Sequence, residues 1–192
     1  MFPAGRWALG WTGDGFAFDN ELPAHEVTAA GFEIDSDVVS WQRYLPYVEA
    51  TGTTPPRYIR QWSGRWQGRH FGQWQDLAPD APATHLTLAE AEAWCAWAGR
   101  RLPTEAEWEI AAVARPEFHW GQVWEWTASS FEGYPGFAPH PYRDYSAPWF
   151  GDRIVLRGAS RASSPRMAHP RYRNFFTPDR NDVLTGFRSC AR

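Results

Sequence analysis

The chain has 192 residues, of which 43% are hydrophobic and 17% aromatic, and a formal net charge of −3. This length suits one domain with a sizeable core and is short for two. No apolar run approaches the roughly 20 residues of a membrane-spanning helix, and the N-terminus lacks a charged segment followed by an apolar one. We therefore expect no membrane insertion, no signal peptide and a cytoplasmic location.

The charges are distributed unevenly along the chain. Residues 143–192 hold ten arginines against four acidic residues, whereas the remaining residues hold nine arginines against eighteen acidic residues. A basic C-terminal third suits an anionic small molecule or an acidic partner. Because it contains no dense basic run, nucleic acid is not an expected partner.

The first half of the chain predicts one strand, one helix and one irregular segment. Residues 27–34 (VTAAGFEI) predict a strand with a glycine irregularity. Residues 40–50 place large apolar side chains at helical spacing and predict a helix. Residues 55–82 are rich in turn formers and read as an insertion that contains a weak hairpin.

Two capping boxes mark the clearest helices. The sequence Thr-Leu-Ala-Glu at 87–90 starts a helix that we expect to end near Ala98, because Gly99 suits a left-handed C-terminal cap. The sequence Thr-Glu-Ala-Glu at 104–107 starts a second helix, which we expect to reach about Ala114.

Residues 121–137 (GQVWEWTASSFEGYPGF) combine aromatic residues with turn formers. The segment matches neither an ordinary amphipathic helix nor an alternating strand. We expect Trp124 and Trp126 to pack the helical half against the loops and Glu125 to hold backbone amides. Residues 134–137 (YPGF) predict a rigid bend.

The remaining C-terminal part predicts loops and short strands. The best strand candidates are residues 154–157 and 187–190. Since no linker interrupts the chain, we expect a single domain over residues 1–192.

No common catalytic or metal-binding motif is present. The six histidines form no HxH, HxxxH or HExxH pattern, so no metal ligand is assigned. GxSxG, Walker and GxGxxG motifs are absent as well. Cys95 and Cys190 are too few for a disulfide framework and are expected to be structural.

Six segments taken together resemble the formylglycine-generating-enzyme (sulfatase-modifying factor) fold family. They are residues 18–27, 89–112, 120–137, 155–160, 171–180 and 186–192. The resemblance covers nearly the whole chain and is weakest in the insertion at 55–82. It implies a compact α+β fold of the C-type-lectin-like type with little regular secondary structure.

Members of this family that modify proteins convert a sulfatase cysteine to formylglycine and bind copper through a pair of cysteines. That pair follows the strand matched here by residues 155–160. Residues 157–176 contain no cysteine. A formylglycine-generating-type oxidase therefore remains an alternative that would need copper bound through Cys95 and Cys190.

The FDNE segment (18–21), the PYRDYS segment (141–146) and RNFFTPDR (173–180) resemble another branch of the family. This branch is the C-terminal domain of ergothioneine-pathway sulfoxide synthases (hercynine oxygenases) and of selenoneine synthases. These are non-haem iron enzymes that use O2 to join hercynine, which is trimethylhistidine, to a thiol or a selenosugar. The resemblance implies that this chain is part of such an oxidoreductase.

The resemblance also implies roles for individual residues. Tyr142 would be the catalytic proton donor during the reaction at iron, and Tyr145 would contact the imidazole of the substrate. Asn174 and Phe175 would surround the trimethylammonium and carboxylate groups, since an aromatic face attracts a quaternary ammonium.

Two further residues concern the second substrate. Arg180 matches an arginine that binds the carboxylate of the thiol cosubstrate in a bidentate manner. Phe176 stands where one branch of the family has an aspartate that holds γ-glutamylcysteine. This difference disfavours γ-glutamylcysteine and leaves cysteine or a selenosugar as the expected donor.

In these synthases the iron ligands come from an N-terminal DinB-like helical bundle with an HxxxHxE motif. This chain has no such motif, so Fe(II) is expected to be held by a DinB-like domain that it does not contain. A fragment, one half of a split enzyme and a standalone module all remain open. The principal alternative to an enzyme is a non-catalytic binding module of the same fold.

Overall fold

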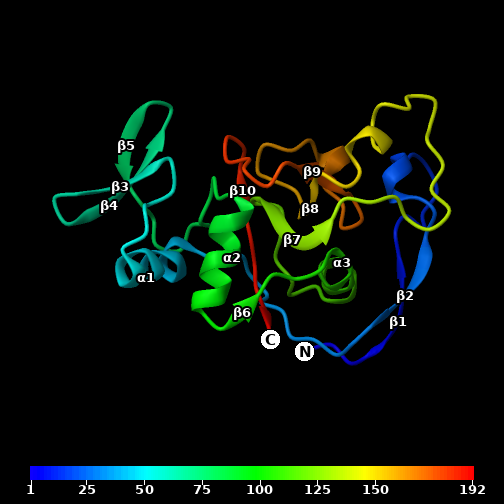
Figure 1. The fold of residues 1–192 in the computed structure, drawn as a ribbon, viewed down its shortest axis with the longest axis horizontal. Helices are drawn as coiled ribbons and strands as arrows, with labels where there is room; N and C mark the ends of the chain where they lie inside the picture. The colour runs from blue at the N-terminus through cyan, green and yellow to red at the C-terminus, as the bar shows by residue number, and fades with distance from the viewer.

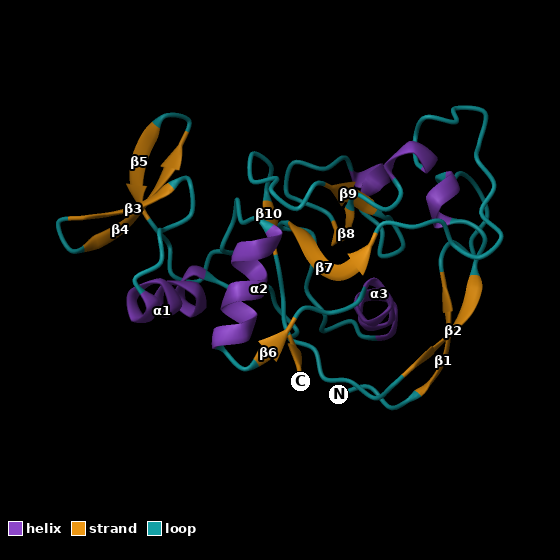
Figure 2. Ribbon diagram, in the orientation of Figure 1, coloured by secondary structure: helices purple, strands orange, loops and turns teal.

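The computed structural model describes residues 1–192 as an α+β fold in which long irregular connections join short elements (Figure 1; Figure 2). The helices are α1 (Trp41–Thr51), α2 (Leu88–Trp97) and α3 (Glu105–Ala114). The strands are β1 (Gly5–Leu9), β2 (His25–Ala29), β3 (Ile59–Trp62), β4 (Arg65–His70), β5 (Gln73–Asp76), β6 (Arg100–Arg101), β7 (Trp124–Ser130), β8 (Ile154–Gly158), β9 (Asn174–Phe176), β10 (Thr185–Gly186) and β11 (Cys190–Ala191). The expected fold class, α+β with little regular secondary structure, is confirmed.

The helices begin and end where the local sequence indicates. In both capping boxes the threonine hydroxyl accepts a hydrogen bond from the third backbone amide of the helix, from Glu90 to Thr87 and from Glu107 to Thr104, each at 3.2 Å. Gly99 adopts a φ of 68° just after α2, which is the left-handed conformation that glycine tolerates best. None of these helices could cross a membrane, because even α1 has only 11 residues.

The central sheet has the strand order β10-β7-β8-β9, in which β10 is parallel to β7 and the other pairs are antiparallel. The sequence pattern did not predict β7, because Glu125, Trp126 and Thr127 are all buried and the strand shows no apolar–polar alternation. The strand at 154–157 is confirmed as β8. Of the strand predicted at 187–190, only Cys190 lies in a strand, β11, and the prediction is wrong for residues 187–189, which link β10 to β11.

The predictions of β structure at residues 27–34 and 55–82 need correction. The strand predicted at 27–34 ends at Ala29, and Gly31 lies against the backbone of Phe2, where only a single bridge to Phe32 continues the pairing. The segment at 55–82 forms a three-stranded antiparallel sheet, β3-β4-β5, rather than a weak hairpin. This segment, called the arm below, stands at the left of the molecule in Figure 1.

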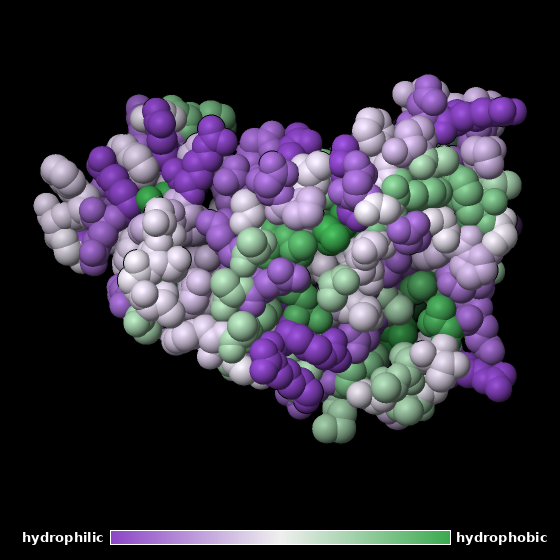
Figure 3. Space-filling view, viewed as in Figure 1, coloured by the Kyte–Doolittle hydropathy of each residue, from purple (hydrophilic) through white to green (hydrophobic).

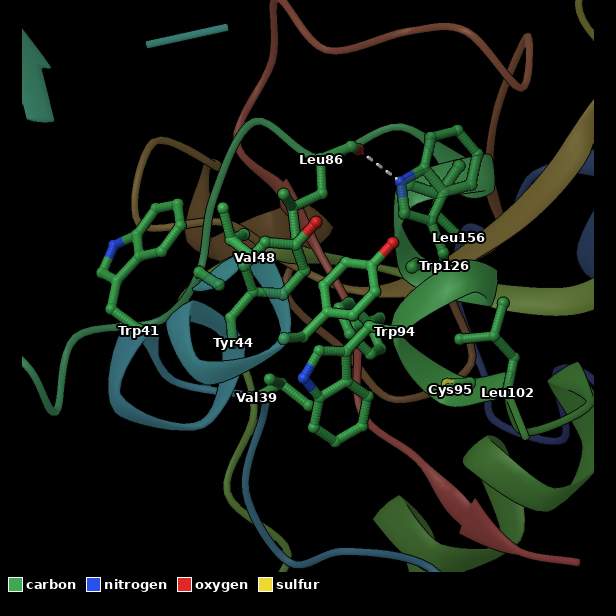
Figure 4. Packing of buried hydrophobic residues seen from close by; sticks show 14 residues of the cluster. Val39, Trp41, Tyr44, Val48, Leu86, Trp94, Cys95, Leu102, Trp126 and Leu156 are labelled. Atoms are coloured by element: carbon green, nitrogen blue, oxygen red, sulfur yellow. Dashed lines mark hydrogen bonds between the residues drawn. The ribbon is translucent and has the colours of Figure 1, made fainter. Parts of the chain in front are cut away.

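The larger apolar cluster joins α1 and α2 to the central sheet and to the base of the arm. Trp126 is fully buried in it, and its indole N–H donates a hydrogen bond to the carbonyl of Leu86 at 2.7 Å (Figure 4). Trp124, next to this cluster, is only partly buried and packs against it. The expectation that these two tryptophans pack the helices against the loops is therefore confirmed.

Three arginines of the C-terminal third are internal. Arg157, Arg173 and Arg188 are at most 1% exposed. Arg188 pairs with the carboxylate of Glu125, which also accepts a hydrogen bond from the indole of Trp108 at 2.7 Å. The prediction that Glu125 holds backbone amides is therefore wrong. Three of the ten arginines in residues 143–192 are buried and do not contribute to a basic surface.

Candidate functional site

The predicted tyrosines line a pocket of about 280 Å³ on the connection between β7 and β8. Tyr142 and Tyr145 form part of its wall together with Phe16, Phe18 and Asp19. Tyr142 is 68% exposed and Phe16 is 73% exposed, so the mouth of the pocket is aromatic and open. Figure 3 shows hydrophobic residues at the upper right, where Figure 1 places this part of the chain.

Tyr145 is the central ring of this site. It stacks on Phe18 with ring centroids 4.4 Å apart, and it meets Phe175 in an edge-to-face arrangement with ring centroids 6.2 Å apart. Its hydroxyl is hydrogen-bonded to the hydroxyl of Tyr172 at 3.2 Å. Burial, with Tyr172 next in importance, raises the pKa of Tyr145 well above its usual range, so the phenol keeps its proton at neutral pH.

The FDNE turn holds the loop that carries the tyrosines. The Asp19 carboxylate accepts a hydrogen bond from the Ser146 hydroxyl at 2.5 Å and another from the backbone amide of His140 at 3.3 Å. The Asn20 side chain donates to the same hydroxyl at 3.1 Å. One buried turn therefore fixes both ends of the loop between His140 and Ser146.

A buried ion-pair network fixes the FDNE turn in its place. Arg173 donates to both carboxylate oxygens of Glu105, at 2.8 and 2.9 Å, and to the backbone carbonyl of Asn20 at 2.7 Å. Arg157 reaches the same carboxylate at 2.9 Å and the hydroxyl of Tyr134 at 3.0 Å. Burial opposes ionisation, but Arg173 and Arg157 together lower the pKa of Glu105.

The bend predicted at 134–137 is confirmed. The amide of Phe137 donates to the carbonyl of Tyr134 at 2.8 Å, and Gly136 has a φ of 84° after Pro135. Proline followed by a glycine of positive φ is typical of a tight turn. The Tyr134 side chain packs under the Arg173 guanidinium at 4.0 Å, which ties the bend to the ion-pair network.

Strand alternation divides the residues predicted on β9 into two groups. Successive side chains of a strand point to opposite faces. Phe175 stacks on Phe131 at 4.0 Å and lies on the side of Tyr145, whereas Phe176 packs against the larger apolar cluster. The Asn174 side chain accepts a hydrogen bond from the Phe175 amide at 3.0 Å.

The structure therefore brings Tyr142, Tyr145 and Phe175 together. By the same alternation, Asn174 lies on the face of β9 that carries Phe176, and no contact joins its side chain to the tyrosines. Arg180 belongs to the other group: its guanidinium lies 4.8 Å from the Phe176 ring. It also forms an ion pair with Asp182, and no contact joins it to the tyrosines.

Sequence reasoning did not assign the residues behind Tyr145. Phe18 and Tyr172 contact that ring directly, and Glu21 lies buried nearby. One oxygen of Glu21 accepts a hydrogen bond from the Phe18 amide at 3.1 Å, and the other lies 3.7 Å from Nε2 of His169. Burial raises the pKa of Glu21 to about 7. The FDNE and RYRNFF segments contained three of these residues, but only the fold shows that they meet.

The residues present do not fit an iron centre. No group of three histidine, cysteine or acidic side chains in residues 1–192 converges as a metal site. Cys95 and Cys190 lie in separate apolar clusters, and burial raises the pKa of each thiol to about 12. This burial disfavours the thiolate form that a copper site needs.

Comparison with known proteins places this arrangement in a family. The family model described as "Sulfatase-modifying factor enzyme 1-like domain" matches residues 1–122 and 117–192. Hercynine oxygenase of Mycolicibacterium smegmatis is 32% identical over 98% of this chain and 60% of its own length. The formylglycine-generating enzyme of Streptomyces coelicolor is 31% identical over 62% of this chain and 49% of its own length.

The structure of PvdO from Pseudomonas aeruginosa shows the same fold. It superimposes with a TM-score of 0.74 at 22% identity and covers 98% of this chain and 91% of its own. The chain spans between 53% and 60% of the length of the three hercynine oxygenases that it matches. The resemblance seen in the sequence is confirmed, and the chain belongs to the family of sulfatase-modifying factor enzyme 1-like domains.

Proposed function

We propose that this chain is the substrate-binding part of a non-haem iron(II), O2-dependent sulfoxide synthase-type enzyme of the cytoplasm. The reaction would join hercynine to a thiol or a selenosugar, as in ergothioneine or selenoneine biosynthesis. The similarity to hercynine oxygenases over nearly the whole chain supports this class of reaction.

The observation that carries the proposal is the aromatic pocket built on the stacked pair Phe18 and Tyr145. Hercynine has a flat imidazole and a quaternary ammonium that cannot donate a hydrogen bond. Aromatic faces hold such a cation by cation–π attraction, and a stacked ring offers a flat surface to the imidazole. The pocket volume of about 280 Å³ suits a small molecule of this kind.

The two tyrosines then have different tasks. Tyr145, held by Phe18 and Tyr172, would orient the imidazole. Tyr142 is exposed at the mouth of the pocket and would present its phenolic proton to the reacting atoms. Arg180 would bind the carboxylate of the second substrate, which would replace the carboxylate of Asp182 as its partner.

The iron would be supplied by a DinB-like helical domain outside this chain. The aromatic mouth formed by Phe16 and Tyr142 is the surface that such a domain would cover, because large exposed aromatic residues commonly mark interaction sites. Iron held by that domain would supply the activation of O2.

Calorimetry with hercynine tests the proposal directly. The chain alone should bind hercynine weakly, and histidine, which lacks the trimethylammonium group, more weakly still. The substitution Phe18→Leu should weaken hercynine binding about tenfold. Phe71→Leu changes an exposed aromatic residue of the arm and should have no effect. No binding of hercynine, with or without a DinB-like protein that carries HxxxHxE, would contradict the proposal.

A non-catalytic binding module is the second candidate, because residues 1–192 contain no metal-binding cluster. It requires hercynine binding without any turnover when Fe(II), O2, a thiol and the DinB-like partner are all supplied. Turnover in that mixture would remove this alternative.

A further inference from the structure

A second cleft, distinct from the tyrosine pocket, lies where the arm meets the body of the protein. Its volume is about 340 Å³, and the two pockets share no lining residue. Tyr58, Arg69 and Leu77 line it from the arm, and His85 and Arg161 line it from the body. We call it the arm cleft.

The arm cleft carries positive charge that nothing in the protein neutralises. The guanidinium groups of Arg69 and Arg161 make no hydrogen bond and no ion pair with any residue of the chain, although most other arginines are paired. The one carboxylate in the lining, that of Asp76, already accepts hydrogen bonds from Arg65 at 3.0 Å and from Gln67 at 3.1 Å. Two free cations therefore face the same cavity.

His85 adds a polar group that is held in an unusual backbone conformation. Its φ is 61°, a conformation that a residue other than glycine rarely adopts and that is commonly found at functional sites. Its Nδ1 lies 3.0 Å from the carbonyl oxygen of Asn181, so Nδ1 carries the proton and Nε2 is the remaining nitrogen. The ring also packs edge-on against Tyr58, with centroids 4.8 Å apart.

The charged groups around His85 are predominantly positive. Burial is the main cause of the lowered pKa of His85, and the positive charge of Arg161 and the neighbouring His70 add to it. The hydrogen bond with the carbonyl of Asn181 and the negative charge of Asp182 act in the opposite direction, although Asp182 is paired with Arg180. An anion in the cleft would offset the positive charges near His85 and raise its pKa.

The apolar part of the lining limits the kind of anion. Tyr58, Ile59 and Leu77 offer an apolar wall beside the two arginines. A fully hydrated inorganic ion would gain nothing from this wall, whereas an organic group attached to the anion would bury apolar surface there.

We infer that the arm cleft binds a small organic anion, whose phosphate or carboxylate group is held by Arg69 and Arg161 and whose apolar part lies against Tyr58 and Leu77. The arm cleft shares no residue with the tyrosine pocket, so anion binding there is independent of the proposed reaction. In this assignment the arm forms one side of a binding site.

Titration calorimetry of the full chain with phenyl phosphate and with inorganic phosphate, at about pH 6 and low ionic strength, tests the inference. Phenyl phosphate should bind about tenfold more tightly than inorganic phosphate, because its ring meets the apolar wall. Arg161→Gln and Arg69→Gln should each weaken binding about tenfold, and benzoate should show the same dependence if the site accepts carboxylates.

The control is Arg143→Gln, which removes the same charge from another unpaired, exposed arginine outside the arm cleft. It should leave the affinity unchanged, and so should Tyr145→Phe in the tyrosine pocket. In NMR titrations, the pKa of His85 should rise when phenyl phosphate is bound. Equal affinity for the two phosphates, equal weakening by all three arginine substitutions, or no binding at all would overturn the inference.

Discussion

The buried carboxylate of Asp19 accepts a hydrogen bond from the hydroxyl of Ser146, at 2.5 Å, across 127 positions of sequence. The same carboxylate accepts a hydrogen bond from the backbone amide of His140. Asp19 therefore holds both ends of the loop that carries Tyr142 and Tyr145. Since a loop of this length has many conformations, its function as part of a pocket depends on such anchors.

Replacing Asp19 with alanine should release this loop. The change leaves the Ser146 hydroxyl and the His140 amide without their acceptor, and we expect a loss of about 2–3 kcal/mol in the free energy of unfolding. Urea unfolding measures the loss, and hydrogen exchange should show faster exchange in residues 140–146. Asp144→Ala changes an exposed residue of the same loop and should cost less than about 0.5 kcal/mol. Equal stability of the two variants would show that Asp19 is not an anchor.

The two tyrosines should respond differently to removal of the hydroxyl. Tyr145→Phe breaks the hydrogen bond to Tyr172 and should reduce the free energy of unfolding by about 1 kcal/mol. Tyr142→Phe should leave stability and hercynine binding unchanged, because its ring is exposed and its hydroxyl has no partner. With a DinB-like partner it should lower turnover by about 10²-fold or more. Full turnover of Tyr142→Phe would rule out its role as proton donor.

The buried Glu21 should make stability depend on pH. Its pKa is raised from 4.5 to about 7 in the folded protein, so folding favours the protonated form. This contribution is complete below about pH 4.5 and is lost as the pH rises through about 7, with an amplitude on the order of 3 kcal/mol. His169 does not compensate the charge, because its own pKa is lowered by burial.

The variant Glu21→Gln stays neutral at every pH and should flatten this dependence. We expect it to be relatively more stable than the parent protein at about pH 8 than at about pH 5. Urea unfolding at both pH values measures the difference, and Glu117→Gln, at an exposed position, serves as the control. A parallel pH dependence in Glu21→Gln and the parent protein would contradict the assignment.

The features that could be predicted best from the sequence are those determined by residues a few positions apart in the chain. Both capping boxes, the C-terminal cap at Gly99 and the bend at 134–137 are local patterns, and all are present in the structure. Strand β7 could not be predicted in this way, because three successive residues, Glu125, Trp126 and Thr127, are buried and the alternation that identifies a half-exposed strand is missing.

The candidate site illustrates the same limit. Tyr142 and Tyr145 were assigned by resemblance, and the structure places them in one pocket. The stacking partner Phe18 and the partition of Phe175 from Phe176 follow from which segments lie side by side, which no local pattern encodes. The basic excess after residue 143 was visible in composition, but burial of its arginines against glutamates far away in sequence was not.

Glu105 is the acidic residue on which the scaffold of the tyrosine pocket depends most. Its carboxylate pairs with Arg173 and Arg157, two guanidinium groups that are at most 1% exposed. Glu105→Gln keeps the shape of the side chain but leaves both positive charges short of their counter-charge, and we expect it to cost about 3–5 kcal/mol. Thermal unfolding should show a clearly lower midpoint than for Glu92→Gln, an exposed change on α2. Because Arg173 also holds the backbone of Asn20, hercynine binding should fall as well, and a variant with normal stability and binding would show that this pair does not support the site.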